Sequence, residues 1–381
     1  MRQASILATA AWLLNGTSAC STSEVAAPPD ASHGMEVADA SPESGKREGG
    51  NDATDVGACQ GDACLPLPDG VLVSGQQTPI GIALDDDNVY WMNLGTYSAP
   101  TGNYSGAQLM KCAKAGCGNA PTVLASGPWN GSTRLAVSGG NVYWATQNML
   151  LSCATDGCTS GPTVLWGGDL APTDIAVGAT AIYFGDTTND DLLTCPLDGC
   201  GANPTVLWSS TVPPAPIALD GPTVYFATSG ISLLSCGTGG CSPILIGGTP
   251  TAMAIGDANV YIGTRGAGAP GAIASCPEAT CPTGLTIVTS NLTNCVGLAV
   301  DATNVYFTDQ GMADPEGGTG GAGSVSTCPI AGCNDQPSPL AGFVNFPQQI
   351  AVDATNAYWT DFGSSTDPHT SNDGRVMAVP K

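Results

Sequence analysis

The chain has 381 residues, including 51 Gly and 29 Pro, only 11% are charged, and no stretch combines a helical period with helix-forming residues. This composition excludes a helical bundle and predicts an all-β, loop-rich protein. The formal net charge is −23, with 24 Asp and Glu against 6 Lys and Arg after residue 57, so the surface repels nucleic acid and anionic membrane, and neither is expected as a direct partner.

Residues 1–19 have the pattern of a signal peptide. Arg2 precedes an apolar run from Ala4 to Leu14, which is too short to span a bilayer. Ser18, Ala19 and Cys20 resemble the end of a bacterial lipobox, which implies that Cys20 is lipidated and anchors the protein to a membrane. Cleavage after Ala19 without lipidation is the alternative.

Residues 20–57 are predicted to form a disordered tether after Cys20. They consist mostly of Ala, Pro, Ser, Gly, Asp and Glu and contain no aromatic residue. Such a segment cannot bury enough apolar surface to offset its chain entropy. The folded domain is therefore expected to comprise residues 58–381.

A repeat dominates residues 58–381. The sequence VDATNVYFTD at 300–309 returns as VDATNAYWTD at 352–361, and looser copies bring the number to seven. Their tyrosines lie 36 to 53 residues apart, at Tyr90, Tyr143, Tyr183, Tyr225, Tyr261, Tyr306 and Tyr358. This spacing is typical of a β-propeller blade, so the sequence predicts seven blades.

Each repeat can be divided into four strands. In the first repeat they are expected at 80–84, 89–93, 108–112 and 122–125, separated by turn residues. The chain begins this domain with a lone fourth strand and ends with a third strand at 374–381. We therefore expect residues 70–74 to pair with residues 376–379 and close the ring, which protects the blade edges.

Fourteen of the 16 cysteines form seven Cys-x4-Cys pairs across the hairpin of the third and fourth strands. They are Cys59 with Cys64, Cys112 with Cys117, Cys153 with Cys158, Cys195 with Cys200, Cys236 with Cys241, Cys276 with Cys281 and Cys328 with Cys333. Structural zinc is the alternative, but it favours two-residue spacing or histidine partners, and the chain has two histidines. We expect one disulfide per blade and therefore an oxidising compartment, with Cys295 left as a thiol.

The repeat resembles a known family. YWTD at Tyr358–Asp361, YFTD at Tyr306–Asp309 and LDG at Leu197–Gly199 are similar to the repeats of YWTD-type and NHL-like β-propellers. The resemblance implies that these residues pack neighbouring blades and that the domain is a binding module. Because YWTD propellers usually have six blades, six is the alternative to seven.

Two sets of candidate ligand-binding residues lie on the face opposite the disulfide hairpins. The first set follows the start of the inner strands, where most residues are small or apolar, and consists of Arg134, Asp174, Gln348 and Gln349. The second set lies in the long connections of repeats five, six, seven and one, and consists of Tyr97, Tyr104, Asp314, Glu316, Asp367, His369 and Asp373. Solvated rim residues are the alternative interpretation of both sets.

These features predict an extracytoplasmic binding or interaction module, secreted or lipid-anchored at the cell envelope of a bacterium and expected to be a monomer. Its ligand, a protein, peptide or carbohydrate, is not identified, although the acidic long loops favour a polar or cationic partner. The alternative is a hydrolase or lyase that uses Asp309 and Asp361 from adjacent repeats as a carboxylate pair. No cofactor is expected; Ca²⁺ on the long-loop carboxylates is conceivable, but no EF-hand-like spacing is present.

Overall fold

The computed structural model describes residues 70–98, 103–129, 134–201, 203–209, 211–228, 232–237, 240–245, 249–266, 270–279, 281, 285–311, 322–363 and 373–381. They belong to one compact unit, Ala58–Lys381. The predicted signal peptide, Cys20 and the tether lie outside the described residues. In the described part of the chain, no helix is long and apolar enough to cross a membrane.

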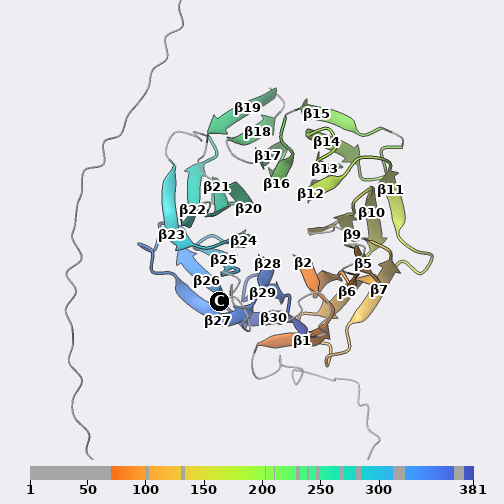
Figure 1. Ribbon diagram of the computed structural model, residues 1–381, viewed down its shortest axis with the longest axis horizontal. Helices are drawn as coiled ribbons and strands as arrows, with labels where there is room; N and C mark the ends of the chain where they lie inside the picture. Colours follow the sequence, from red (N-terminus) through yellow and green to blue (C-terminus); the bar gives the residue numbers. More distant parts are fainter. Residues whose placement is uncertain are drawn as a thin grey trace, which may run out of the picture. The chain divides into compact units, whose positions relative to one another are not determined.

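Seven four-stranded antiparallel sheets are arranged around a common centre (Figure 1). From the inner to the outer strand, blade 1 contains β2 (Pro79–Leu84), β3 (Asn88–Asn93), β6 (Ala107–Ala113) and β7 (Thr122–Gly127), and blade 2 contains β8 (Leu135–Ser138), β9 (Asn141–Ala145), β10 (Met149–Ala154) and β11 (Thr163–Gly167). Blade 3 contains β12 (Pro172–Val177), β13 (Ala181–Asp186), β14 (Asp191–Pro196) and β15 (Thr205–Ser209), and blade 4 contains β16 (Pro214–Asp220), β17 (Thr223–Thr228), β18 (Ser232–Gly237) and β19 (Gly240–Leu245). Blade 5 contains β20 (Thr249–Gly256), β21 (Asn259–Arg265), β22 (Gly271–Pro277) and β23 (Thr286–Leu292), and blade 6 contains β24 (Cys295–Val300), β25 (Asn304–Asp309), β26 (Ala322–Pro329) and β27 (Ser338–Asn345).

Blade 7 is built from both parts of the domain. It contains β28 (Pro347–Val352), β29 (Asn356–Asp361), β30 (Gly374–Pro380) and, as its outer strand, β1 (Val71–Gln76). The pairing of β1 with β30 places Val71 opposite Met377 and Val73 opposite Val376 (Figure 1). The predicted all-β, seven-bladed propeller closed by its first strand is therefore confirmed, and the six-bladed alternative is wrong.

The second strand of each blade forms most of the core because it is covered on both faces. In β3, the side chains of Val89, Tyr90, Trp91 and Met92 are all fully buried. Tyr90 and Met92 pack with residues of blade 2, while Val89 and Trp91 pack with residues of blade 7. A strand between two blades is apolar on both faces, so it lacks the polar alternation of a strand with one solvated face.

A repeated polar cluster holds the turn between the first and second strands. In blade 6, Asp301 Oδ1 accepts the backbone N–H groups of Thr303 and Asn304, at 2.8 and 2.9 Å, and Oδ2 accepts the Tyr306 hydroxyl at 2.9 Å. The same cluster recurs in blades 1 and 7, at Asp85 with Tyr90 and at Asp353 with Tyr358. The Asp-x-x-Asn-x-Tyr pattern of these repeats thus fixes both the turn and the tyrosine ring.

Lysines connect two of these clusters to the next blade. Lys381, at the end of β30, lies 2.6 Å from Asp301 Oδ2 and 5.4 Å from the centre of the Tyr306 ring. Lys114, in blade 1, lies 3.0 Å from Asp353 Oδ2 in blade 7. The second contact bridges the first and last blades, where the ring closes.

The disulfides lie in the hairpins between third and fourth strands, as predicted. Five are Cys112–Cys117, Cys153–Cys158, Cys195–Cys200, Cys276–Cys281 and Cys328–Cys333. Cys236 is also disulfide-bonded and lies opposite Cys241 in the register of β18 and β19. Cys295 is free and buried.

The first of the seven predicted cysteine pairs cannot be compared with the structure. Cys59 and Cys64 both lie outside the described residues, which begin at residue 70. The disulfide expected between Cys59 and Cys64 therefore stays a prediction. The expectation of one bridge per blade is thus confirmed in blades 1, 2, 3, 5 and 6.

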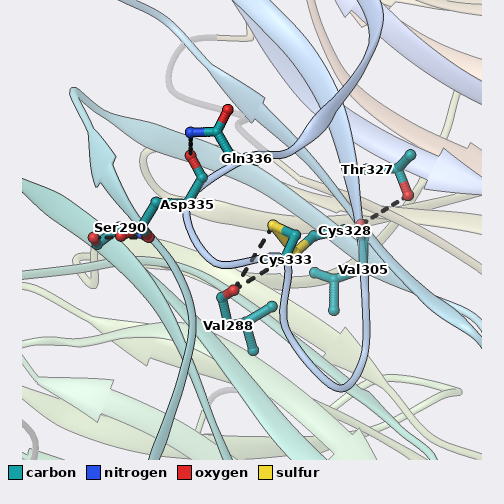
Figure 2. Close-up of a disulfide and its surroundings, with 8 residues drawn as sticks. All are labelled: Val288, Ser290, Val305, Thr327, Cys328, Cys333, Asp335 and Gln336. Carbon is teal, nitrogen blue, oxygen red and sulfur yellow. Dashed lines mark hydrogen bonds between the residues drawn. A yellow bond between two sulfur atoms is a disulfide. The ribbon is translucent and has the colours of Figure 1, made fainter.

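These hairpins also join neighbouring blades. Figure 2 shows the Cys328–Cys333 hairpin of blade 6 against Val288 of β23 in blade 5, where the Cys333 N–H donates to the Val288 carbonyl at 3.2 Å. The Asp335 side chain accepts the Ser290 hydroxyl at 2.9 Å on the same strand. Equivalent backbone bonds join Cys200 to Leu165 and Cys158 to Leu124. Each of these disulfides therefore restrains a loop that contacts the neighbouring sheet.

The Asp301 cluster predicts a pH-dependent contribution to stability. Burial raises the pKa of Asp301, but the hydrogen bonds from Lys381, Thr303, Asn304 and Tyr306 outweigh it, so the pKa lies below its ordinary value. An acid with a depressed folded pKa stabilises the fold above its unfolded pKa, about 3.9, and loses that contribution as the pH falls through the folded pKa. Asp301→Asn should therefore lower the free energy of unfolding by about 1 kcal/mol at pH 7 and by progressively less below about pH 4.

Denaturant titrations at pH 7, 5, 3 and 2 would measure this difference. The exposed Asp156, in the Cys153–Cys158 hairpin, supplies the control, because Asp156→Asn removes the same charge without breaking a described contact. A deficit for Asp301→Asn that grows toward low pH would contradict the role given to the cluster.

Candidate functional site

A cavity of about 330 Å³ lies where the inner strands begin. All seven blades contribute to its wall. The lining residues are Ile80, Gly81, Arg134, Thr173, Asp174, Ala215, Pro216, Pro250, Thr251, Arg265, Asn294, Val296, Gln348 and Gln349. We call this cavity the mouth pocket. The four residues predicted at the channel mouth, Arg134, Asp174, Gln348 and Gln349, all lie on it.

Asp174 is the buried acid of the mouth pocket. Its side chain is only 4% exposed, and Arg134 Nε lies 3.0 Å from Oδ1. Oδ1 also accepts the N–H of Ile175, and Oδ2 accepts the N–H of Ile217 in blade 4, both at 2.8 Å. Burial raises the pKa of the Asp174 carboxyl, while Arg134 and the two N–H groups act to lower it. Asp174 thus joins blades 2, 3 and 4 and holds Arg134 at the pocket wall.

Arg265 is a second cation on the mouth pocket, and sequence reasoning missed it. It ends β21, is exposed, and its backbone forms an isolated bridge with Asn294. Within the described ranges, no carboxylate forms an ion pair with it. Its signal in the sequence is its place one residue after Thr264, the polar residue that ends the second strand of its repeat. Few positively charged residues occur in the domain, and this one lies beside the inner strands.

Two glutamines form the blade 7 side of the mouth pocket. Gln348 Nε2 donates to the Phe346 carbonyl at 3.0 Å, and Gln349 Nε2 donates to the Val296 carbonyl at 2.9 Å. Blades 6 and 7 approach closely here, since a Cβ on Gly297 would lie 2.5 Å from the Gln348 carbonyl oxygen. These contacts fix the amide nitrogens of both glutamines against the backbone.

A second, smaller cavity adjoins the mouth pocket. It has a volume of about 280 Å³ and is lined by Gln310, Phe346, Gln348 and Phe362. Gln348 lines both cavities. Two of the four lining residues are aromatic, so we call this cavity the phenylalanine pocket. The sequence analysis did not identify Gln310, Phe346 or Phe362.

Three of the seven predicted long-loop residues lie in the described part of the chain. Tyr97 and Tyr104 face each other across a small hairpin inserted into blade 1, formed by β4 (Thr96–Ser98) and β5 (Asn103–Ser105), with ring centres 5.1 Å apart. Burial, and then Tyr97, raise the pKa of Tyr104. Asp373 is exposed and lies against Gly363, just before β30. Asp314, Glu316, Asp367 and His369 lie outside the described residues.

The acids that end the second strands bind backbone. Asp309 accepts the N–H groups of Thr293 and Asn294, at 2.9 and 2.7 Å. Asp186 binds the N–H of Ala171 at 2.7 Å in the same way. Asp361 accepts the N–H of Gly363 at 3.4 Å, and burial raises its pKa to about 6. Asp309 and Asp186 thus hold the chain that enters the inner strand of their own blade, and Asp361 holds the chain that leaves β29.

Other reactive groups are few in the described part of the chain. Burial, and then Asp309, raise the pKa of the Cys295 thiol well above its ordinary value, which disfavours a thiolate nucleophile. Among the described residues, no three His, Cys, Asp or Glu side chains are grouped so that they could hold a metal ion.

Comparisons with known proteins place the fold and no more. No protein-family model matches the chain, and no curated protein matches its sequence. The crystal structure of the computationally designed protein Ika8 is similar with a TM-score of 0.52 and 13% identity, covering 81% of this chain and 100% of Ika8. A nidogen/laminin complex aligns with a TM-score of 0.40 and 15% identity over 70% of this chain and 80% of that one, and BamB from Moraxella catarrhalis with 0.43 and 12% over 78% and 84%.

The buried Asp174 contacts predict a large loss of stability on truncation. Asp174→Ala removes the acceptor of two backbone N–H groups and leaves Arg134 without its ion-pair partner. We expect the free energy of unfolding to fall by about 3 kcal/mol, the cost typical of breaking a buried pair. Asp174→Asn keeps an acceptor oxygen and should cost less.

Urea denaturation would measure both changes. Asp169→Ala is the control, because Asp169 is exposed on the loop before β12 and should change stability by less than about 0.5 kcal/mol. Equal losses for Asp174→Ala and Asp169→Ala would show that Asp174 does not hold the three blades.

Proposed function

We propose that this protein is an exported binding protein whose ligand occupies the mouth pocket of a seven-bladed propeller. The observation that carries this proposal is the composition of the pocket wall: every blade contributes, and most of the contributing positions directly follow the start of an inner strand. A pocket of about 330 Å³ with a few convergent polar groups has the size and chemistry of small-ligand sites.

The proposed location outside the cytoplasm rests on the cysteines. Five disulfides within one domain are typical of an oxidising compartment. The signal-peptide pattern of residues 1–19 and the lipobox-like Cys20 add to this support. We propose that Cys20 carries the lipid and that residues 21–57 tether a monomeric propeller to the envelope.

The proposed kinship with YWTD-type propellers rests on the second strands. Tyr306, Phe307 and Thr308 are buried in β25, as are Tyr358, Trp359 and Thr360 in β29. Their place between blades agrees with the structural role that the resemblance implies.

Binding is favoured over catalysis because the carboxylates that a hydrolase would need accept backbone hydrogen bonds. Asp309 and Asp361, the pair on which the hydrolase alternative depends, hold backbone N–H groups. The two histidines of the chain, His33 and His369, lie outside the described residues, so the described site offers no imidazole base. The mouth pocket itself contains one carboxylate, Asp174, which is engaged by three N–H donors.

Filling the mouth pocket tests its role. Val296→Trp enlarges a side chain of the pocket wall and should reduce ligand binding at least roughly tenfold, because the ligand and the indole would compete for the same volume. Ligand-observed NMR with a small-metabolite mixture would detect binding. Val164→Trp, on the outer strand β11 where Val164 is 57% exposed, is the matched control. Loss of binding in both variants, or in neither, would refute a site at the mouth.

The anchor is tested separately. Cys20→Ala should move the protein from the membrane fraction to the soluble extracytoplasmic fraction, because the acyl chains on Cys20 would supply the membrane affinity. Fractionation followed by immunoblotting measures the partition. An unchanged membrane fraction would show that Cys20 is not the anchor.

A further inference from the structure

We propose that the ligand of the mouth pocket is a small carboxylate that carries an aromatic or similarly large apolar group beside the carboxylate. The carboxylate pairs with Arg265, and the apolar group enters the phenylalanine pocket. This inference rests on the proposed function, since it assigns a ligand class to the same site.

The charge of the mouth pocket is opposite to that of the domain. Its charged lining residues are Arg134, Asp174 and Arg265, so the wall has a formal charge of +1. Residues 58–381 together have a formal charge of −18. A cationic ligand would be attracted by most of the surface but not by this pocket. An anion is the ligand that the pocket charge favours, because a charge in direct contact with the ligand outweighs surface charges that lie more than a Debye length away and are screened.

The two arginines of the pocket differ in availability. Arg134 forms an ion pair with Asp174 through its Nε, so the carboxylate of Asp174 balances the charge of Arg134. Arg265 is exposed and forms no ion pair in the described part of the chain. A guanidinium group presents its N–H donors in a planar fork that matches a carboxylate. Arg265 is therefore the group that a carboxylate would meet.

A short chain of contacts links Arg265 to the phenylalanine pocket. The backbone of Arg265 bridges to Asn294, and Asn294 Nδ2 donates to Gln310 Oε1 at 2.8 Å. Gln310 lines the phenylalanine pocket together with Phe346 and Phe362. Gln348 lines both cavities, which are therefore adjacent. The proposed ligand would span the two cavities past Gln348, with one end at the guanidinium and the other at the two phenylalanines.

The sizes of the cavities set the size of the ligand. Volumes of about 330 and 280 Å³ suit a head and a side group rather than a polymer segment enclosed on all sides. An apolar group that enters a cavity walled by two phenylalanines gains the hydrophobic and ring contacts that aromatic pockets supply. Free N-acyl aromatic amino acids and peptide ends with an aromatic last residue share this chemistry.

Calorimetric titration of the purified full chain with three matched probes tests the ligand class. The probes are N-acetyl-L-phenylalanine, its carboxamide, which removes the charge, and N-acetylglycine, which removes the ring. We expect the first to bind at least roughly tenfold more tightly than either of the others, because each lacks one of the two contacts. The peptide Gly-Gly-Gly-Phe, with a free carboxylate, then distinguishes a chain end from a free small acid as the source of this chemistry.

Arg265→Gln should weaken binding of N-acetyl-L-phenylalanine roughly ten- to a hundredfold and abolish its advantage over the carboxamide. Arg265→Lys should restore part of the affinity, since it keeps the charge without the fork. Arg375→Gln removes the same charge from an exposed site on β30 outside both pockets, and it should leave binding unchanged.

Equal binding of the acid and the carboxamide, or no binding of N-acetyl-L-phenylalanine to the native chain, would overturn the ligand class. The proposed function would survive that result if another compound binds the native chain and loses affinity in Val296→Trp. If Val296→Trp changes no binding, the mouth pocket itself is not the site, and both proposals fail.

Discussion

Closure of the ring by β1 is the constraint on which the rest of the structure depends. Without the pairing of Val71 with Met377 and Val73 with Val376, blade 7 would have three strands and an unpaired edge at β30. Blade 1 would also lose a neighbour for Val89 and Trp91, which are covered by residues of blade 7. Because each second strand is buried only by the blades beside it, one open joint would expose core on two sheets.

The contacts that lock this joint are polar as well as apolar. Lys114 reaches Asp353 across it, and the Asn119 side chain accepts the Ser74 N–H at 2.7 Å. Lys114 of blade 1 and Lys381 of blade 7 also lie over the rings of Tyr358 and Tyr306, each in a neighbouring blade, so both lysines connect two blades. Six basic side chains follow residue 57. The three lysines each lie over a tyrosine ring, while Arg134 and Arg265 line the mouth pocket.

Much of the fold could be predicted because each blade contains a copy of the same sequence repeat. The tyrosine of VDATNVYFTD and the Cys-x4-Cys spacing mark the second strand and the outer hairpin, and the strands expected in blade 1 begin and end within two residues of β2, β3, β6 and β7. The hairpin of Tyr97 and Tyr104 was not predicted, since it occurs in one repeat and has no periodic signal. Arg265, Phe346 and Phe362 were missed for a related reason, since they lie just outside the repeated positions. Phe346 and Phe362 contact each other within blade 7, whereas Arg265 lines a cavity with Gln348 only because the ring brings blades 5 and 7 to the same centre.

The division between repeated and unrepeated residues also explains where a site can arise. Residues that recur in every blade are committed to burial or to backbone hydrogen bonds, as Asp309 is to Thr293 and Asn294. The first positions of the inner strands differ from blade to blade, from Ile80 to Asp174 to Gln349, and all three of these residues line the mouth pocket. Some axial residues, such as Asp174, also bond to neighbouring blades, so only the axial residues without such bonds can change at little cost to the sheets. In this chain, residues just outside the repeated positions, Arg265 at the end of β21 and Phe346 and Phe362 beside β28 and β29, line the two cavities, and the arginine there can attract an anion that the acidic domain would otherwise repel.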